Sequence, residues 1–160
     1  MGQLLIGSFT ARLDKSGRIK IPEKFRLAIE ENFGKEVFIT SLNDQSIQIY
    51  PLSVWLNLTN ITGEGFLHLK PEIKRFLLRV NHMGTHYEID SKGRILISQH
   101  LRDKARLDGE VEVLGLHNYI EVWNPELLEE SVLQQPLTDE DFEHISRLSP
   151  LKRESSYDPD

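Results

Sequence analysis

Two segments of the chain place the same charged residues around a glycine. The first reads LDKSGRIKIP (13–22), and the second, 76 positions later in a chain of 160 residues, reads IDSKGRILIS (89–98). In both, an aspartate is followed four positions later by an arginine that comes directly after the glycine. Arginine binds phosphate oxygens, and its guanidinium group matches the O6 and N7 atoms of guanine. The repeated segment is therefore a candidate contact to DNA.

The elements that must position these arginines are predicted to be β-hairpins. Apolar residues recur at every second position on both sides of the first turn, at Phe9, Ala11, Leu13, Ile19 and Ile21. This spacing places the apolar side chains on one face of the hairpin and the arginine on the other. In the turns, Asp14 and Asp90 can accept bonds from backbone N–H groups, and Gly17 and Gly93 can adopt a positive φ.

A helix is predicted after each hairpin. In the first copy it begins at Pro22 and ends at Gly34, because proline suits the first helical position and glycine suits the end. In the second copy Ser98 is the expected N-cap and Gly109 the expected stop. The two helices place Arg26 and Arg102 at equivalent positions.

Each copy then continues with two more strands and a closing helix that begins at a proline, Pro51 or Pro125. The predicted strands are 37–40, 47–50, 111–114 and 119–123. A single hairpin with one helix buries too little apolar surface to fold alone. We therefore expect an α+β fold in which the two copies share one core around a pseudo-twofold axis.

The predicted organisation of the chain has four parts. They are a first module (1–62), a linker with a basic amphipathic helix (63–84), a second module (85–135), and an acidic C-terminal helix with a disordered tail (136–160). Thr138 and Asp141 form a predicted capping box at the start of the C-terminal helix.

The linker helix has an apolar stripe with helical spacing, made of Ile73, Phe76, Leu77 and Val80. Lys74, Arg75 and Arg79 fall outside the stripe, and Leu78 projects among them. Either a second surface, such as a neighbouring subunit, covers Leu78, or it is a single exposed leucine of the kind that most proteins have.

The first hairpin is the more basic of the two. Its candidate DNA-binding residues are Arg12, Lys15, Arg18 and Lys20. The second hairpin has Glu88 and Leu96 in place of Arg12 and Lys20, and its candidates are Lys92 and Arg94. In either copy the aspartate and the arginine can instead form a surface ion pair of little energetic value. Both interpretations remain open for the first copy, and the ion pair is favoured in the second.

The net charge of −6 argues at first against a polyanionic partner. The acidic residues are concentrated at the C-terminal end, where residues 126–160 hold ten acids and three bases. Residues 1–125 hold 15 acids and 16 bases, so the part with the repeated motif is close to neutral. The charge objection therefore applies to the tail rather than to the modules.

Several classes of protein are disfavoured by the sequence. The chain has no cysteine, which excludes disulfides and thiolate metal sites and agrees with a reducing compartment. His82 and His86 are four residues apart, but Gly84 between them is expected to end the helix, so we predict no metal site and no cofactor. No hydrolase, P-loop or dinucleotide-binding motif is present, and we predict that the protein is not an enzyme.

A cytoplasmic location is expected. No apolar run is long enough to cross a bilayer, and the first fourteen residues lack a basic leader followed by a long apolar stretch.

The motifs resemble those of the MraZ family of bacterial transcriptional regulators. The resemblance covers roughly residues 4–148 and rests on the twin D-x-x-x-R motifs, the YP after the first unit (50–51), the basic helix between the copies and the VWNP after the second unit (122–125). It marks Asp14 and Arg18 in the first motif and Asp90 and Arg94 in the second, with the DNA role strongest for Arg18.

The resemblance implies a fold similar to the AbrB type, a double-split β-barrel built from swapped hairpins. It also implies an octameric or dodecameric homo-oligomeric ring that binds short direct repeats containing guanine in double-stranded promoter DNA, upstream of a cell-division and cell-wall gene cluster. The protein would then be associated with the nucleoid. In a ring, weak contacts by single subunits combine into useful avidity when the DNA sites repeat in register.

A second interpretation comes from a different class of protein. A homo-oligomeric, antitoxin-like interaction module could use the acidic tail to bind a basic protein without recognising a DNA sequence. Binding to repeat-bearing DNA distinguishes the two interpretations.

Overall fold

The structure is a computed structural model that describes residues 4–59 and 70–148. It divides into two compact units, Met1–Leu127 and Leu128–Asp160. The predicted boundary between residues 62 and 63 and the predicted disorder of the ending KRESSYDPD (152–160) lie outside the described residues. None of the helices in the described ranges is long and apolar enough to cross a bilayer.

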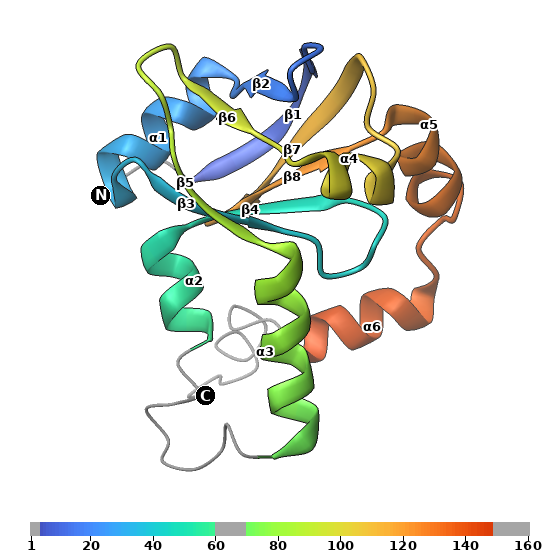
Figure 1. The fold of residues 1–160 in the computed structure, drawn as a ribbon. Helices are drawn as coiled ribbons and strands as arrows, with labels where there is room; N and C mark the ends of the chain where they lie inside the picture. The colour runs from blue at the N-terminus through green and yellow to red at the C-terminus, as the bar shows by residue number, and fades with distance from the viewer. Residues whose placement is uncertain (1–3, 60–69, 149–160) are drawn as a thin grey trace, which may run out of the picture. The chain divides into compact units, whose positions relative to one another are not determined.

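The first unit contains the same series of elements twice (Figure 1). The first series is β1 (Leu5–Arg12), β2 (Arg18–Lys20), α1 (Glu23–Phe33), β3 (Glu36–Thr40), β4 (Ile47–Pro51) and α2 (Leu52–Leu58). After α3 (Pro71–Met83), the second series is β5 (Thr85–Glu88), β6 (Arg94–Leu96), α4 (Gln99–Ala105), β7 (Glu110–His117), β8 (Ile120–Trp123) and α5 (Pro125–Leu128), which reaches the unit boundary. The predicted duplication and the predicted α+β class are both confirmed.

The six-stranded sheet mixes strands of the two copies. Its order is β1-β7-β8-β4-β3-β5, with every neighbouring pair antiparallel. The first strand of each copy thus pairs with the third strand of the other copy: β1 pairs with β7, and β5 pairs with β3. Exchanging the two copies leaves this order unchanged, which is the pattern that a pseudo-twofold axis produces.

The predicted hairpins form only at their turns. Beyond the single bridge between Leu13 and Ile19, β1 leaves to pair with β7 and β2 pairs with β6 of the other copy. The predicted pairing of the two strands beside each turn is therefore wrong beyond the turn itself. A three-residue strand such as β2 buries its isoleucine by joining its counterpart over the shared core, which a local hairpin does not provide.

The main core lies between the β2–β6 ribbon and one face of the six-stranded sheet. Ile19 and Ile95 are buried at the centre of the ribbon, and they belong to the same apolar cluster as Ile39 and Ile49 of the sheet. Helices α1 and α4 contribute to this cluster through Phe25, Ala28, Ile29, Leu101 and Ala105. Phe25 and Ile29 in α1, and Leu101 and Ala105 in α4, are four residues apart, so in each helix they share the face that packs on this core.

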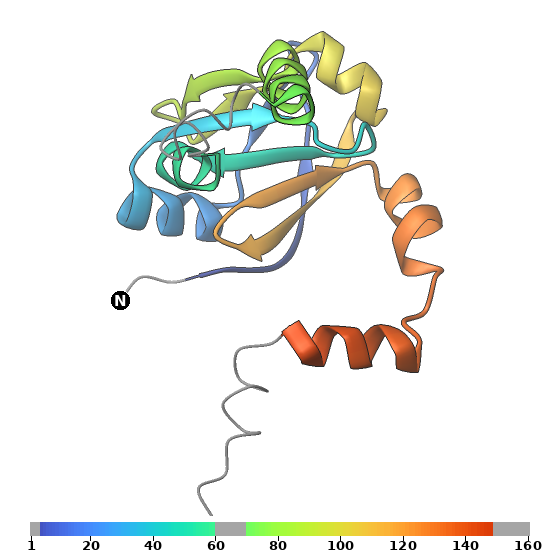
Figure 2. The ribbon, with the colours of Figure 1, turned by 90° about the horizontal axis from the view of Figure 1, so that it is seen from below.

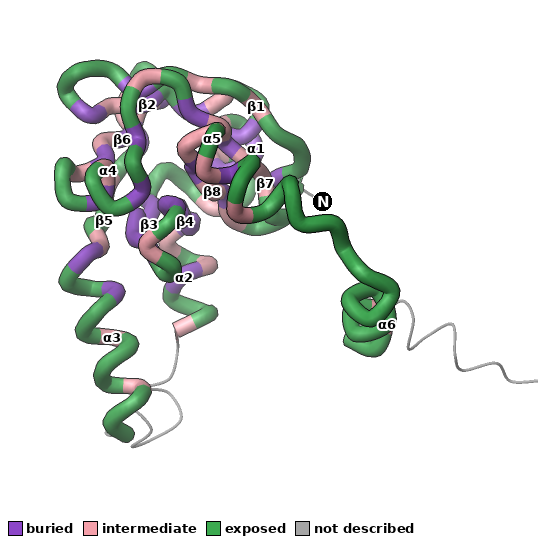
Figure 3. Tube along the Cα trace, turned by 90° about the vertical axis from the view of Figure 1, so that its right-hand side faces the viewer, coloured by how far each residue is buried: buried purple, intermediate pink, exposed green. Residues whose placement is uncertain are grey.

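Helices α2 and α3 pack on the opposite face of the sheet and are seen nearly end-on in Figure 2. Their contacts form a second cluster of Phe38, Tyr50, Trp55 and Val80. Towards its N-terminus, α3 extends away from this cluster and is largely exposed (Figure 3). Within the described chain only Val80 of the predicted stripe is buried, and Phe76 is 39% exposed. Leu78, which lies outside the stripe, is 62% exposed.

Three helix boundaries differ from the predictions, and one is the start of α2, which begins at Leu52 after Pro51 rather than at Pro51. Helix α1 begins at Glu23, with Pro22 as the residue before it, and ends before Gly34 as expected. Helix α4 is capped by the Ser98 hydroxyl as predicted, but it ends at Ala105, and Arg106 adopts the left-handed conformation that ends it. Gly109 lies beyond, in the approach to β7. The end of α4 has no glycine to mark it in the sequence. Arg106 takes the positive φ there instead.

The second unit contains a π-helical segment, η3 (Glu129–Leu133), and α6 (Asp139–Leu148). The predicted capping box is confirmed, since the Asp141 N–H donates to the Thr138 hydroxyl at 3.1 Å and the Thr138 N–H donates to the Asp141 carboxylate at 2.9 Å. The apolar residues of α6 are all more than half exposed: Phe142, Ile145 and Leu148.

Candidate nucleic-acid interface

The β2–β6 ribbon presents three cations on one face. Arg18 lies opposite Leu96 and Lys20 lies opposite Arg94, while Ile19 lies opposite Ile95 between them. Residues directly opposite in an antiparallel pair share a face, and so do residues two apart along a strand. Because the isoleucines face the core, the arginines, the lysine and the leucine face away from it.

One turn lies at each end of this ribbon. The Ile97 N–H donates to the Gly17 carbonyl at 2.9 Å, and the Ile21 N–H donates to the Gly93 carbonyl at the same distance. The first turn (14–17) is therefore attached to the end of β6, and the second turn (90–93) to the end of β2. Each turn sits beside the strand of the other copy.

In the first turn Asp14 organises the backbone. Its Oδ1 accepts the N–H groups of Ser16 and Arg18, both at 2.9 Å, and the Ser16 hydroxyl at 2.6 Å. The Ser16 hydroxyl, followed by the Arg18 N–H, lowers the pKa of the Asp14 carboxyl below its usual value. Gly17 has a φ of +93°, as predicted for the turn. Asp14 and Gly17 thus have the structural positions that the sequence indicated.

The Arg18 side chain does not pair with Asp14 in the described structure. Its Nη1 donates to the Ser16 hydroxyl at 3.2 Å, and no carboxylate of residues 4–59 or 70–148 lies within ion-pair distance of it. The ion-pair interpretation of the first motif therefore does not describe this conformation. The guanidinium group of Arg18 is available to an external acceptor.

The second turn repeats the backbone arrangement but not the arginine contact. Asp90 Oδ1 accepts the N–H groups of Lys92 and Arg94 at 2.9 and 2.8 Å, and Gly93 has a φ of +78°. Arg94 Nε then donates to Asp90 Oδ2 at 3.0 Å. The hydrogen bond from the Arg94 backbone N–H lowers the pKa of the Asp90 carboxyl most, and the hydrogen bond from the Arg94 side chain lowers it further. The ion pair favoured for the second motif is confirmed.

The antiparallel ribbon redistributes the charges that the sequence assigned to each hairpin. Lys20 was counted with the first turn, but it lies opposite Arg94 and lines a shallow pocket with Ser91 and Lys92 of the second turn. Leu96, counted with the second turn, lies opposite Arg18. The second end of the ribbon is consequently more basic, and the first end less basic, than the linear comparison of the two segments indicated.

The remaining candidates lie around the first turn. Lys15 is exposed in the turn, as is Lys92 in the second. Arg12 pairs with Glu110 in the β1–β7 ladder and lines a pocket with Lys15 and Asp108. Arg12 thus has two acidic residues of the second copy as neighbours, which reduces the net positive charge at its position.

Two further arginines, not assigned a role from the sequence, cross from one copy to the turn of the other. A Cβ atom at Gly17 would lie 2.8 Å from Arg102 Cζ, and one at Gly93 would lie 2.5 Å from Arg26 Cδ. The equivalent places of these arginines in α1 and α4 were visible in the sequence. Their partners were not, because the exchange of turns between copies is a tertiary feature.

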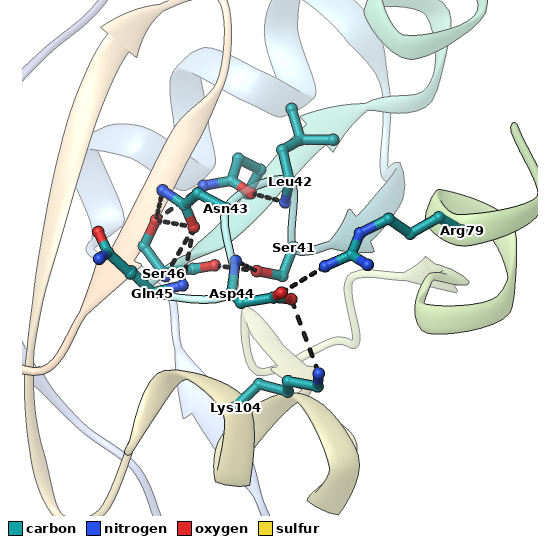
Figure 4. Close-up of polar contacts among 9 residues, drawn as sticks. Ser41, Leu42, Asn43, Asp44, Gln45, Ser46, Arg79 and Lys104 are labelled. Carbon is teal, nitrogen blue, oxygen red and sulfur yellow. Dashed lines mark hydrogen bonds and ion pairs between the residues drawn. The ribbon is translucent and has the colours of Figure 1, made fainter. Parts of the chain in front are cut away.

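Arg79 of the basic helix α3 is also neutralised. Asp44, in the left-handed conformation in the β3–β4 loop, forms an ion pair with Arg79 and lies with Oδ1 3.9 Å from Lys104 Nζ of α4 (Figure 4). Asn43 and Ser41 side chains bond the loop backbone and hold Asp44 in place. The loop therefore connects α3 to α4 and removes part of the positive charge predicted for the linker helix.

The two histidines considered for a metal site lie on different elements. His82 belongs to α3, whereas His86 belongs to β5, where its Nε2 lies 3.0 Å from Glu36 Oε1. The expectation that Gly84 separates them is confirmed. In the described ranges no group of three potential ligands could hold a metal ion.

Comparison with known proteins identifies the family. Residues 4–64 and 83–147 match the family model described as "MraZ protein, putative antitoxin-like". The chain is 37% identical over 140 residues to the transcriptional regulator MraZ of Acidobacterium capsulatum, which covers 88% of this chain and 95% of that protein. It is 33% identical over 143 residues to the transcriptional regulator MraZ of Koribacter versatilis, covering 89% and 97%. One turn with its aspartate and arginine lies in each of the two matched segments, and the chain belongs to the MraZ family.

Proposed function

We propose that this protein is a transcriptional regulator that binds specific promoter DNA through the outer face of the β2–β6 ribbon. The observation that supports this most is the pairing of the two motif strands into one ribbon, with exposed Lys20 and partly exposed Arg18 and Arg94 on a single outer face. The major groove of B-DNA, about 12 Å wide, admits a two-stranded β-ribbon. The names of the relatives, transcriptional regulators, agree with this role.

Within this proposal the residues have different tasks. Arg18, which forms no ion pair with a carboxylate of the described residues, reads a guanine through O6 and N7. Lys15, Lys20 and Lys92 bind phosphates, and Arg12 and Arg94, which have acidic neighbours, contribute less. Asp14, Gly17, Asp90 and Gly93 shape the turns and make no contact with DNA. The protein performs no catalysis and needs no cofactor for this role.

The fold within which the ribbon acts is proposed to be an AbrB-like double-split β-barrel. The exchange of β1, β2, β5 and β6 between the two copies supports this assignment, because swapped strands around a pseudo-twofold axis are what such a barrel requires.

We further propose that the chain acts as an octameric or dodecameric ring on direct repeats upstream of a cell-division and cell-wall gene cluster, in association with the nucleoid. The exposed apolar residues Phe76 and Leu78 on α3 support a subunit contact there. Sedimentation of Leu78→Asp tests this contact, since a charge buried at an interface dissociates it. An unaltered oligomer mass would remove α3 from the interface.

The DNA proposal is tested by measuring affinity for a promoter fragment with direct repeats and for a scrambled duplex of the same composition. We expect cooperative binding that prefers the repeats and weakens strongly between about 50 and 200 mM salt. Arg18→Ala should abolish the preference, whereas Arg147→Ala, which also removes one guanidinium but from α6 of the second unit, should retain it. Equal binding of both duplexes by the wild type would exclude sequence-specific recognition.

That outcome would favour the second candidate, an antitoxin-like interaction module. The family description and the acidic helix α6, which exposes Phe142, Ile145 and Leu148 beside four acidic residues, support this candidate. Such a helix is suited to a basic protein partner with an apolar groove.

A further inference from the structure

We propose that Arg102, supplied by the second copy, binds a DNA phosphate at the first turn, and that its counterpart Arg26 does not bind DNA at the second turn. This inference rests on the proposed DNA-binding function and adds a residue that lies outside both D-x-x-x-R motifs. It makes the first turn a composite site, with Lys15 and Arg18 from one copy and Arg102 from the other.

The position of Arg102 is set by two contacts. Its Nε donates to the Ile97 carbonyl at 3.0 Å, and its guanidinium group lies over Gly17, where a Cβ atom would be 2.8 Å from Cζ and 2.9 Å from Nη2. Because glycine has no side chain, the guanidinium group reaches the backbone of the turn itself. The charge is therefore held one residue from Arg18 of the other copy.

The terminal nitrogens of Arg102 remain unused. In the described parts of the chain no acceptor lies within hydrogen-bonding distance of Nη1 or Nη2, and no carboxylate forms an ion pair with them. The residue is partly exposed. A guanidinium group that is fixed through Nε on a partly exposed residue, with neither terminal nitrogen hydrogen-bonded within the described chain, is prepared to donate to phosphate oxygens at little entropic cost.

Arg26 occupies the equivalent place at the second turn but is neutralised. The glycine there is covered by the aliphatic part of the side chain, with Cδ closest to the Cβ position of Gly93. The guanidinium group continues past the turn to Glu30, at 2.8 Å, and to Glu23, at 3.8 Å. With both acids in contact, this arginine has little remaining attraction for an anion.

The sequence of the two helices explains the difference. Glu23 and Glu30 stand three residues before and four residues after Arg26. The same positions around Arg102 hold Gln99 and Arg106, so the second copy lacks both acids. Gln99 bonds instead to Asp103, with Nε2 2.7 Å from Oδ1. The copies have thus diverged at the two positions that decide whether the crossing arginine keeps its charge available.

The test is the salt dependence of DNA binding by Arg102→Gln, because glutamine can still donate to the Ile97 carbonyl. Loss of one phosphate contact lowers the slope of log affinity against log salt by about one for each subunit that contacts the DNA. At about 0.1 M salt the affinity should fall about eightfold per contacting subunit, equally for repeat-bearing and scrambled duplexes. Arg26→Gln is the matched control, and its slope should equal that of the wild type.

A purely structural role for Arg102 predicts a different result. Arg102→Lys keeps the charge but loses the planar group over Gly17. If Arg102 contacts a phosphate, this variant should keep the wild-type slope of log affinity against log salt. If Arg102 only supports the turn, the slope should change. Melting temperature and sedimentation mass of each variant show whether folding and assembly are preserved. If Arg102→Gln keeps the wild-type slope, or if Arg102→Lys loses it, Arg102 is a structural residue.

Failure of this inference is distinct from failure of the proposed function. If the wild type binds repeat-bearing DNA and Arg18→Ala abolishes the preference, the function stands whatever Arg102→Gln does. If the wild type binds no DNA, the function and the inference are both excluded.

Discussion

The two turns share their backbone hydrogen bonds, yet Arg18 in the first contacts the Ser16 hydroxyl while Arg94 in the second contacts the Asp90 carboxylate. The residue two positions before the arginine differs, being serine in the first motif and lysine in the second. In the first turn the serine hydroxyl donates to Asp14 and accepts from Arg18, so it stands between the carboxylate and the guanidinium group. A duplicated motif can therefore keep the same backbone shape in both copies, while only one copy leaves its arginine without an ion pair to the motif aspartate.

The largest contrast should appear when each arginine is removed. Arg18→Ala should lower affinity for repeat-bearing DNA by about tenfold to a hundredfold, the range expected for one bidentate contact to a base. Arg94→Ala should cost about twofold to fivefold, because its charge is already partly neutralised by Asp90. Fluorescence anisotropy titrations measure both. Equal losses, with unchanged melting temperature and assembly, would show that the two turns contribute alike.

Replacing the turn glycine by alanine should lower the free energy of unfolding by different amounts in the two copies. Both have a positive φ, so Gly17→Ala should lower the free energy of unfolding by about 1 kcal/mol through backbone strain. Gly93→Ala should cost more, about 2 kcal/mol, because its Cβ would lie 2.5 Å from Arg26 Cδ, closer than the 2.8 Å between a Cβ at Gly17 and Arg102 Cζ. Urea unfolding monitors both variants, and a larger loss for Gly17→Ala would contradict this reasoning.

Ser16→Ala should make the first turn resemble the second. Without the hydroxyl, the Arg18 guanidinium can pair with Asp14 as Arg94 pairs with Asp90. We expect a loss of DNA affinity of about twofold to fivefold, which corresponds to the free energy of an exposed ion pair. Ser16→Thr keeps a hydroxyl and is the control. A wild-type affinity for Ser16→Ala would mean that the serine does not keep Arg18 free.

The smallest expected effect is on the loss of stability at low pH. The folded-state pKa of both Asp14 and Asp90 is lowered, so the stability that each contributes is present above the unfolded pKa, about 3.9, and is lost as the pH falls through the lower folded value. Asp14→Asn and Asp90→Asn should each lose less melting temperature than the wild type between about pH 4 and pH 2. If the melting temperature of either variant depends on pH as that of the wild type does, other carboxylates cause the loss of stability in acid.

Much of the fold followed from local patterns. The alternation around each turn, the positive φ of the glycines and the cap at Ser98 depend on residues within a few positions of one another, and the structure confirms them. The end of α4 could not be predicted, because Arg106 adopts a positive φ that arginine rarely takes.

Parts of the candidate interface were less accessible from the sequence. Assigning Lys20 to the first turn assumed a local hairpin, whereas the β2–β6 pairing moves it beside the second. The roles of Arg26 and Arg102 were missed for the same reason, since each contacts a glycine of the other copy.

The sequence alone determined that this protein contains two copies of one charged turn, each with an aspartate and a glycine that set the backbone locally. It also determined which copy has acids around its helix arginine, because those residues are neighbours within one helical turn. Only the tertiary structure decided which side chains meet at each turn. Strand exchange is driven by burial of apolar residues in the shared core, and the surface charges move with the strands that the core selects.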